Sequence, residues 1–100
     1  MQRGLVARGQ GTVDRPMRIH VRLFANLRDR FPSGDRGRGE IELGDRTSLA
    51  ELIERLGIPD PLAQMVLVDG LQEPRSRETR ARRILEDGQT VSIFPPVAGG

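Results

Sequence analysis

The sequence predicts an α+β fold, in which a mixed sheet of four or five strands carries one main helix on one face. Two observations carry this prediction. Apolar and polar residues alternate at 17–24 and again at 90–94, and a capped apolar stripe with helical period lies between them at 49–56. A length of 100 residues is enough for one modest core. If the first and last strands are parallel neighbours, the connection that carries the helix covers one sheet face.

The first strand is expected at 17–24. Its residues face alternate sides, which is typical of a strand covered on one face. The inward set is Ile19, Val21 and Leu23, and the outward set is Arg18, His20, Arg22 and Phe24. Residues 1–16 mix Gly, Arg, Gln and Asp without an apolar period. We therefore expect 1–16 to be a disordered N-terminal arm and 17–100 to be the folded domain, with Met17 as an alternative start of translation.

The first strand is expected to form an antiparallel hairpin with a second strand at 40–43, whose Ile41 and Leu43 face inward. The connection consists of a polar segment at 25–31, with one helical turn at most, and a turn-rich loop at 32–39. The glycines of this loop resemble a phosphate-binding loop only superficially, because such a loop needs a lysine and a following helix.

The main helix has clear start and stop signals. Ser48 is placed to cap its N-terminus, and Glu51, three residues later, completes a capping box. Gly57 and Pro59 end the helix, since glycine suits the C′ position and proline cannot continue the helical hydrogen bonds. The apolar stripe that packs on the sheet is Leu49, Leu52, Ile53 and Leu56.

The second half of the chain is expected to supply further strands. After a brief helical turn at 60–64, a third strand at 65–68 is closed by the hairpin turn Asp69-Gly70, and 71–73 pairs back as a short fourth strand. The polar stretch 73–83 is predicted to be a solvated loop, with Ile84 and Leu85 anchoring its end. The final strand at 90–94 directs Val91 and Ile93 inward and Thr90, Ser92 and Phe94 outward.

Composition excludes several classes of function. All sixteen basic residues are arginine, so the chain has no lysine for a Schiff base or an isopeptide bond. Without cysteine it has neither a disulfide framework nor a catalytic thiol, and a single histidine argues against a histidine-based metal site. No apolar run is long enough to cross a membrane, and the N-terminus lacks the apolar core of a signal peptide. We expect a soluble, cytoplasmic protein with no membrane partner, no metal and no bound cofactor.

Two further interpretations of single features are weaker. The arginines between 75 and 83 could contact an acidic partner or nucleic acid, but three Phe and no Tyr or Trp leave few rings for base stacking, so no nucleic-acid partner is expected. His20 and Ser92 could face the same side of adjacent strands and mimic a hydrolase pair. With no evident orienting acid and no pocket, two surface residues that meet across a ladder are the preferred interpretation.

The rest of the chain is expected to present the C-terminal segment 93–100 to a partner protein. Pro95 and Pro96 supply no N–H donor and therefore end the strand ladder. Gly99 and Gly100 lack a Cβ, so this flexible end is expected to pass through a narrow channel into the active site of a partner enzyme.

The first strand contains Val-Arg-Leu-Phe-Ala, the last strand follows Leu-Glu-Asp-Gly-Gln-Thr-Val, and the chain ends in Phe-Pro-Pro-Val-Ala-Gly-Gly. With these segments and this order of elements, the chain resembles the MoaD/ThiS sulfur carriers. Over 17–100 the chain looks most like the small subunit of molybdopterin synthase. The resemblance implies a ubiquitin-like β-grasp fold. It also implies that an E1-like adenylyltransferase uses ATP to adenylate Gly100, and that sulfur then converts the acyl-adenylate into a thiocarboxylate.

The resemblance further implies a co-substrate and not a catalyst in its own right, although the chain would count as a subunit of molybdopterin synthase. Its expected partners are the adenylyltransferase, a sulfurtransferase, and the large subunit of that synthase or an equivalent recipient enzyme. Thiamine or cysteine synthesis are alternative destinations of the sulfur, and a ubiquitin-like interaction module without tail chemistry is the rival class. The expected site comprises Gly100 as the reactive position, Gly99, Ala98 and Val97 as the passage, and Phe94, Phe24, Pro95, Pro96 and Arg22 as the partner-binding residues.

Overall fold

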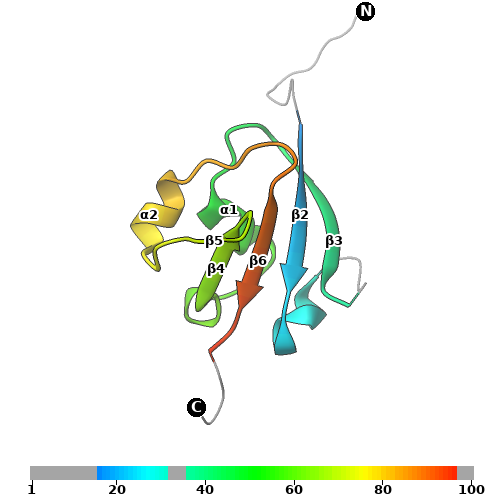
Figure 1. The fold of residues 1–100 in the computed structure, drawn as a ribbon, viewed down its shortest axis with the longest axis vertical. Coiled ribbons are helices and arrows are strands. Elements are labelled where there is room, and N and C mark those ends of the chain that lie inside the picture. The colour runs from blue at the N-terminus through cyan, green and yellow to red at the C-terminus, as the bar shows by residue number, and fades with distance from the viewer. Residues whose placement is uncertain (1–15, 32–35, 97–100) are drawn as a thin grey trace, which may run out of the picture.

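The computed structural model describes residues 16–31 and 36–96, and these form one five-stranded mixed sheet (Figure 1). The strands lie in the order β3-β2-β6-β4-β5. β2 and β6 are parallel neighbours at the centre, and the other three pairs are antiparallel. The predicted sheet is therefore confirmed. The strand bounds are β2 Met17–Leu23, β3 Arg38–Leu43, β4 Met65–Val68, β5 Leu71–Gln72 and β6 Thr90–Phe94.

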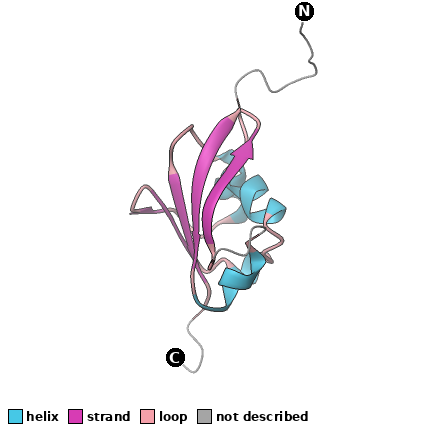
Figure 2. Cartoon of the chain, turned by 90° about the vertical axis from the view of Figure 1, so that its right-hand side faces the viewer, coloured by secondary structure: helices cyan, strands magenta, loops and turns pink. Residues whose placement is uncertain are grey.

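The helical elements lie on one side of this sheet (Figure 2). They are two α-helices, α1 and α2, and two short 3-10 helices, η1 and η2. We call the sheet side that they cover the inner face and the opposite side the outer face. Their bounds are η1 Ala25–Arg30, α1 Leu49–Arg55, η2 Asp60–Leu62 and α2 Arg77–Arg82.

Helix α1 begins and ends as its sequence predicts. The Glu51 N–H donates to Ser48 Oγ at 3.1 Å and the Ser48 N–H donates to Glu51 Oε1 at 2.8 Å, which completes the capping box. Gly57 follows with a φ of +73°, the left-handed conformation that glycine adopts without strain. All four residues of the predicted stripe are buried against the inner face of the sheet: Leu49, Leu52, Ile53 and Leu56.

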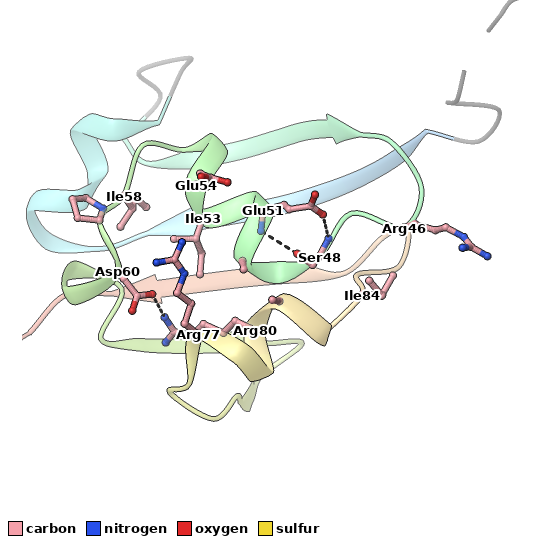
Figure 3. Close-up of a pocket in the computed structure, with 13 residues that line it drawn as sticks. Arg46, Ser48, Glu51, Ile53, Glu54, Ile58, Asp60, Arg77, Arg80 and Ile84 are labelled. Atoms are coloured by element: carbon pink, nitrogen blue, oxygen red, sulfur yellow. Dashed lines mark hydrogen bonds and ion pairs between the residues drawn. The ribbon is translucent and has the colours of Figure 1, made fainter. Parts of the chain in front are cut away.

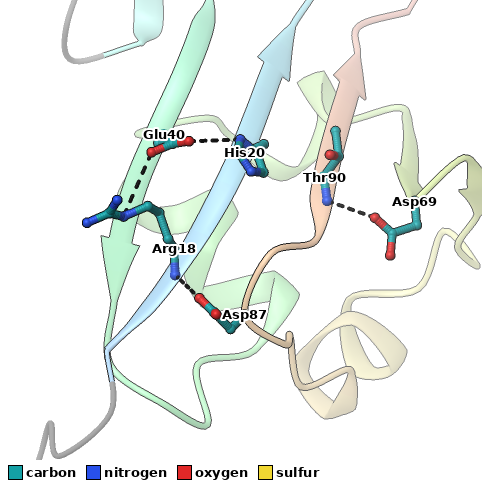
Figure 4. Close-up of polar contacts among 6 residues, drawn as sticks. All are labelled: Arg18, His20, Glu40, Asp69, Asp87 and Thr90. Atoms are coloured by element: carbon teal, nitrogen blue, oxygen red, sulfur yellow. Dashed lines mark hydrogen bonds and ion pairs between the residues drawn. The ribbon is translucent and has the colours of Figure 1, made fainter.

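The alternation of the two central strands is also confirmed. Residues of β2 are buried and exposed in strict turn, and Val91 and Ile93 of β6 are fully buried. β2 ends at Leu23, one residue before the predicted end. Two backbone N–H groups of these strands donate to acidic side chains: Arg18 N–H to Asp87 Oδ1 at 2.7 Å and Thr90 N–H to Asp69 Oδ1 at 2.9 Å (Figure 4).

The connection between β2 and β3 differs from its prediction. The stretch expected to be a polar connector is η1, and it contributes buried Leu27 and Phe31 to the core. β3 begins at Arg38 and not at residue 40, so Gly39 belongs to the strand. A Cβ on Gly39 would lie 2.7 Å from the Phe31 ring. The bare glycine therefore lets this ring pack directly on the strand, which explains why the turn-like sequence is part of the sheet.

The stretch 73–83 is not a solvated loop, and that prediction was wrong. Six of its residues form α2. Ser76 caps the N-terminus of this helix, because its Oγ accepts a hydrogen bond from the Thr79 N–H at 3.2 Å. The helix carries Arg80 into the interior, where its side chain is 2 % exposed. Beyond α2, Leu85 is buried as expected, whereas Ile84 is 44 % exposed and only its backbone bridges to Ser48.

Candidate functional site

The outer face carries an aromatic stack where the two central strands end. Phe24 follows β2 and Phe94 is the last residue of β6, and their rings stack with centroids 4.1 Å apart and planes 11° apart. The Phe24 N–H donates to Ile93 O at 3.2 Å, which continues the pairing of the strands by one residue. Both side chains are half-buried. The outward direction predicted for both rings is confirmed.

A shallow, mostly apolar groove surrounds this stack. Met65 lies directly opposite Phe94 in the ladder between β4 and β6, so it belongs to the same face. Pro95 lacks an N–H, which explains why β6 ends at Phe94. The groove is lined by Phe24, Ala25, Asn26, Gln64, Met65, Phe94, Pro95 and Pro96. We call Phe24, Met65, Phe94, Pro95 and Pro96 the docking surface, because a connected apolar patch of this kind is typical of a protein-binding site.

The chain turns sharply after Phe24 to build one wall of the groove. Ala25 has a φ of +55°, which residues other than glycine seldom adopt. Its carbonyl oxygen accepts a hydrogen bond from Arg28 Nε at 3.1 Å. The turn directs η1 toward the inner face and leaves the Phe24 ring on the outer face.

Arg22 borders the docking surface. Its side chain is exposed, and its guanidinium carbon lies 5.6 Å from the centroid of the Phe24 ring, within cation–π range. The structure thus brings together on one surface the five predicted partner-binding residues: Arg22, Phe24, Phe94, Pro95 and Pro96. The other four predicted site residues, at 97–100, lie outside the described residues, as does the predicted arm apart from Pro16.

Met65 is a site residue that the sequence analysis did not single out. The only signal for it was its place in a predicted strand, which puts Met65 and Leu67 on one face. Because all four residues of β4 are apolar, the burial of Val66 and Val68 in the structure is what shows that this is the outer face. Ala25, Asn26 and Gln64 carried no comparable signal. They reach the groove through turns, whose side-chain directions do not follow a strand period.

His20 and Ser92 do not form a catalytic pair. Arg22 lies opposite Ser92, and His20 lies opposite Thr90. The expectation that no acid lies near His20 was wrong, since Glu40 on the adjacent strand places Oε2 3.2 Å from His20 Nδ1 (Figure 4). Glu40 also contacts Arg18 Nε at 3.8 Å, and all three side chains are about half-exposed or more. They form a surface ion cluster.

A second groove lies between α1 and α2 (Figure 3), and its notable residue is Arg80. Arg80 Nη2 donates to the buried Ala63 O at 2.9 Å, and Nη1 lies 3.6 Å from Asp60 Oδ1. Burial is the main cause that lowers the Arg80 pKa, Asp60 opposes this effect, and Arg75 adds to it. These contacts fasten α2 to the turn at 60–63, so we assign Arg80 a structural role.

Two properties of the described ranges, 16–31 and 36–96, bear on the class of protein. These ranges contain no cluster of three or more His, Asp or Glu side chains arranged to hold a metal ion. Within the same ranges, no helix has the length and apolar character needed to cross a membrane.

The sequence pattern of the ThiS family matches residues 21–100 of this chain. The chain belongs to the ThiS family. It is therefore a ubiquitin-like sulfur carrier of the MoaD/ThiS type, and its fold is the β-grasp. A comparison with functionally curated proteins gave no match.

Several solved structures resemble this ThiS-family protein. A Haloferax volcanii protein solved in solution is 24 % identical, with 94 % of this chain and 98 % of that chain covered and a TM-score of 0.64. Molybdopterin converting factor subunit 1 from Pyrococcus furiosus is 24 % identical, with 81 % and 99 % covered and a TM-score of 0.59. A complex of subunits 1 and 2 of the molybdopterin-converting factor from Helicobacter pylori contains a chain 21 % identical, with 84 % and 100 % covered and a TM-score of 0.50. At these identities the likeness shows the fold.

Proposed function

We propose that the chain carries sulfur for molybdopterin synthesis as a thiocarboxylate on Gly100. Hydroxide is a poor leaving group, so the carboxylate of Gly100 must first be activated. It attacks the α-phosphorus of ATP, which forms an acyl-adenylate and releases pyrophosphate. Sulfur at the oxidation level of sulfide then adds to the acyl carbon and displaces AMP. The chain supplies only the carboxylate, and an E1-like adenylyltransferase supplies the nucleotide site.

The observation that carries this proposal is that β6 contributes Phe94 to the docking surface and leads directly into the tail. β6 ends with Phe94 in the aromatic stack, and Pro95 and Pro96 continue the same apolar groove toward 97–100. An enzyme that binds the docking surface therefore receives the chain at the point where the tail begins. The family match extends through Gly100, which supports the assignment of the reactive position to this residue.

The composition of the tail suits transfer between active sites. Gly99 and Gly100 have no side chains, so a narrow channel needs room only for their backbone. Val97 and Ala98 are small enough to follow them. Proline restricts φ at 95 and 96, which limits the directions in which the tail can leave the sheet. The passage residues are therefore Val97, Ala98 and Gly99, and the sulfur is held on Gly100.

The partners follow from this chemistry. A sulfurtransferase supplies sulfur to the adenylate, and the recipient is the large subunit of molybdopterin synthase. Support for the recipient comes from the similar Helicobacter pylori chain, which was solved in complex with subunit 2 of the molybdopterin-converting factor. In this role the protein is a co-substrate, acts in the cytoplasm and binds no cofactor of its own.

The test of this function is an ATP–pyrophosphate exchange assay with the E1-like enzyme from the same genome. The chain should stimulate exchange of labelled pyrophosphate into ATP, because formation of the adenylate is reversible. The variant Gly99→Val should stimulate it far less, since a β-branched side chain restricts the backbone and widens the tail. A chain that stimulates no exchange with any E1-like enzyme of that genome would be an interaction module instead.

The destination of the sulfur is tested separately. The thiocarboxylated chain should convert the sulfur-free pterin precursor into molybdopterin when the large subunit is added. If it instead supports only formation of the thiamine thiazole or of cysteine, the carrier assignment stands and the molybdopterin branch is wrong.

A further inference from the structure

The outer face of the sheet carries two arginines directly opposite each other. Arg22 of β2 pairs with Arg38 of β3, and both side chains are exposed. At the next position along the ladder, the Leu23 N–H donates to Gly37 O at 2.6 Å, so Leu23 and Gly37 are a hydrogen-bonded pair. Arg22 and Arg38 therefore occupy a non-hydrogen-bonded pair, where opposite side chains stand closest.

This pair departs from the charge pattern of its own ladder. The two preceding outward pairs each include a carboxylate, with Arg18 opposite Glu42 and His20 opposite Glu40. Like charges that face each other across a ladder destabilise it. Among the described residues, no carboxylate lies within ion-pair distance of either guanidinium of the arginine pair. On the other side of Arg22, the neighbour from β6 is the uncharged Ser92.

The arginine pair is continuous with the docking surface. The Arg22 guanidinium lies 5.6 Å from the centre of the Phe24 ring, and that ring stacks on Phe94. Arg22 and Arg38 also share a groove, whose lining residues are His20, Val21, Arg22, Arg38, Gly39, Glu40 and Thr90. A protein that covers the aromatic stack therefore also approaches both guanidinium groups and removes water from them.

We propose that the arginine pair binds carboxylates of the adenylating enzyme when this enzyme docks on the aromatic stack. This inference rests on the proposed function and names the chemistry of the partner's surface. A guanidinium binds a carboxylate through two parallel hydrogen bonds, and its planar group retains the charge at any physiological pH. A partner acid between the two side chains would neutralise the repulsion that the free chain carries. Charge complementarity of this kind also speeds association.

The same face argues for an acidic protein and against nucleic acid. Glu40 and Glu42 follow Arg38 on the outward side of β3, so the positive charge at this end of the ladder covers only two residues. A nucleic-acid backbone requires a longer basic track. The two rings are also stacked on each other, which hides one face of each from a base.

The absence of lysine allows a direct test. In the variants Arg22→Lys and Arg38→Lys, the new amine is the only one besides the N-terminus, and it preserves the positive charge. A carbodiimide joins an amine to a carboxylate only when the two are in contact. Each variant, mixed with the adenylating enzyme, should therefore form a covalent product whose linked peptide contains the new lysine and an Asp or Glu of the enzyme. The matched control is Arg55→Lys on the exposed side of α1, on the opposite face of the sheet.

The inference is overturned if both outer-face variants give no more product than Arg55→Lys and the unmodified chain, while all of them still support pyrophosphate exchange. A chain that supports no exchange in any form contradicts the proposed function, and the inference falls with it. A second measurement uses the double variant Arg22→Gln/Arg38→Gln. Its association with the enzyme should be about tenfold slower than that of the parent at low salt, and the difference should shrink near 1 M salt, where the screening length is about 3 Å. Equal rates at low salt would also contradict the inference.

Discussion

Replacing Phe94 by serine tests whether the aromatic stack is a docking surface or a part of the core. Phe94 is mostly buried, and its ring lies 4.1 Å from that of Phe24. Burial of most of a phenylalanine side chain stabilises a fold by about 1–2.5 kcal/mol. A stacked pair adds about 0.5–1.5 kcal/mol. Phe94→Ser should therefore lower the free energy of unfolding by about 2–3 kcal/mol, which a domain with an ordinary stability of about 5–15 kcal/mol survives.

Phe94→Ser should strongly weaken binding to the adenylating enzyme, although the chain should still fold. An aromatic residue at the centre of an interface typically contributes about 2 kcal/mol or more, so the Kd for the adenylating enzyme should rise about 30-fold or more. Calorimetric titration gives the Kd, and urea unfolding gives the stability. Phe31→Ser is the matched control, because Phe31 is only 5 % exposed and its loss should cost about 3–5 kcal/mol.

Two outcomes would refute this reasoning. If Phe94→Ser destabilises the fold as much as Phe31→Ser does, Phe94 acts as a core residue and its partly exposed position on the outer face has been misinterpreted. If Phe94→Ser folds and binds with the affinity of the parent, the enzyme docks elsewhere on the molecule.

Two further predictions concern the fold. Arg80→Ala should cost about 2–5 kcal/mol in urea unfolding, because it removes a large buried side chain and leaves Ala63 O without its donor. Arg80→Met fills more of the space and buries no charge. It should therefore cost only about 1–3 kcal/mol, the cost of leaving the Ala63 carbonyl oxygen unpaired. Equal costs for the two variants would contradict the structural role of Arg80. Deletion of residues 1–16 should leave the melting temperature nearly unchanged, because they have no apolar period to pack. A drop of several degrees on deletion would show that the arm contributes to the core.

The sequence was informative wherever a simple period or cap governs the structure. Strict alternation predicted the two central strands and the outward direction of Phe24 and Phe94, since a strand places successive side chains on opposite faces. The pattern from Ser48 to Gly57 predicted α1, because capping and C-terminal glycine signals act within a few neighbouring residues.

The misses arise where tertiary contacts override local composition. α2 looked like a solvated stretch because arginine is usually exposed, yet the long Arg80 side chain enters the core and meets Ala63 and Asp60. Phe31 looked like the end of a polar connector because its partner is the bare backbone of Gly39, eight residues away. Glu40 near His20 and the unbalanced arginine pair depend on the strand register, which the loop sequence between β2 and β3 does not reveal.

The central claim is that Gly100 holds the sulfur, and the intact mass of the chain tests it most directly. After incubation with the E1-like enzyme, ATP and sodium sulfide, the mass should rise by the difference between one sulfur and one oxygen atom. Fragmentation should map this change to the last peptide, and a variant with one residue appended after Gly100 should show no change. If the appended variant gains sulfur as readily as the parent, Gly100 is not the site and the account of this chain as a thiocarboxylate carrier is wrong.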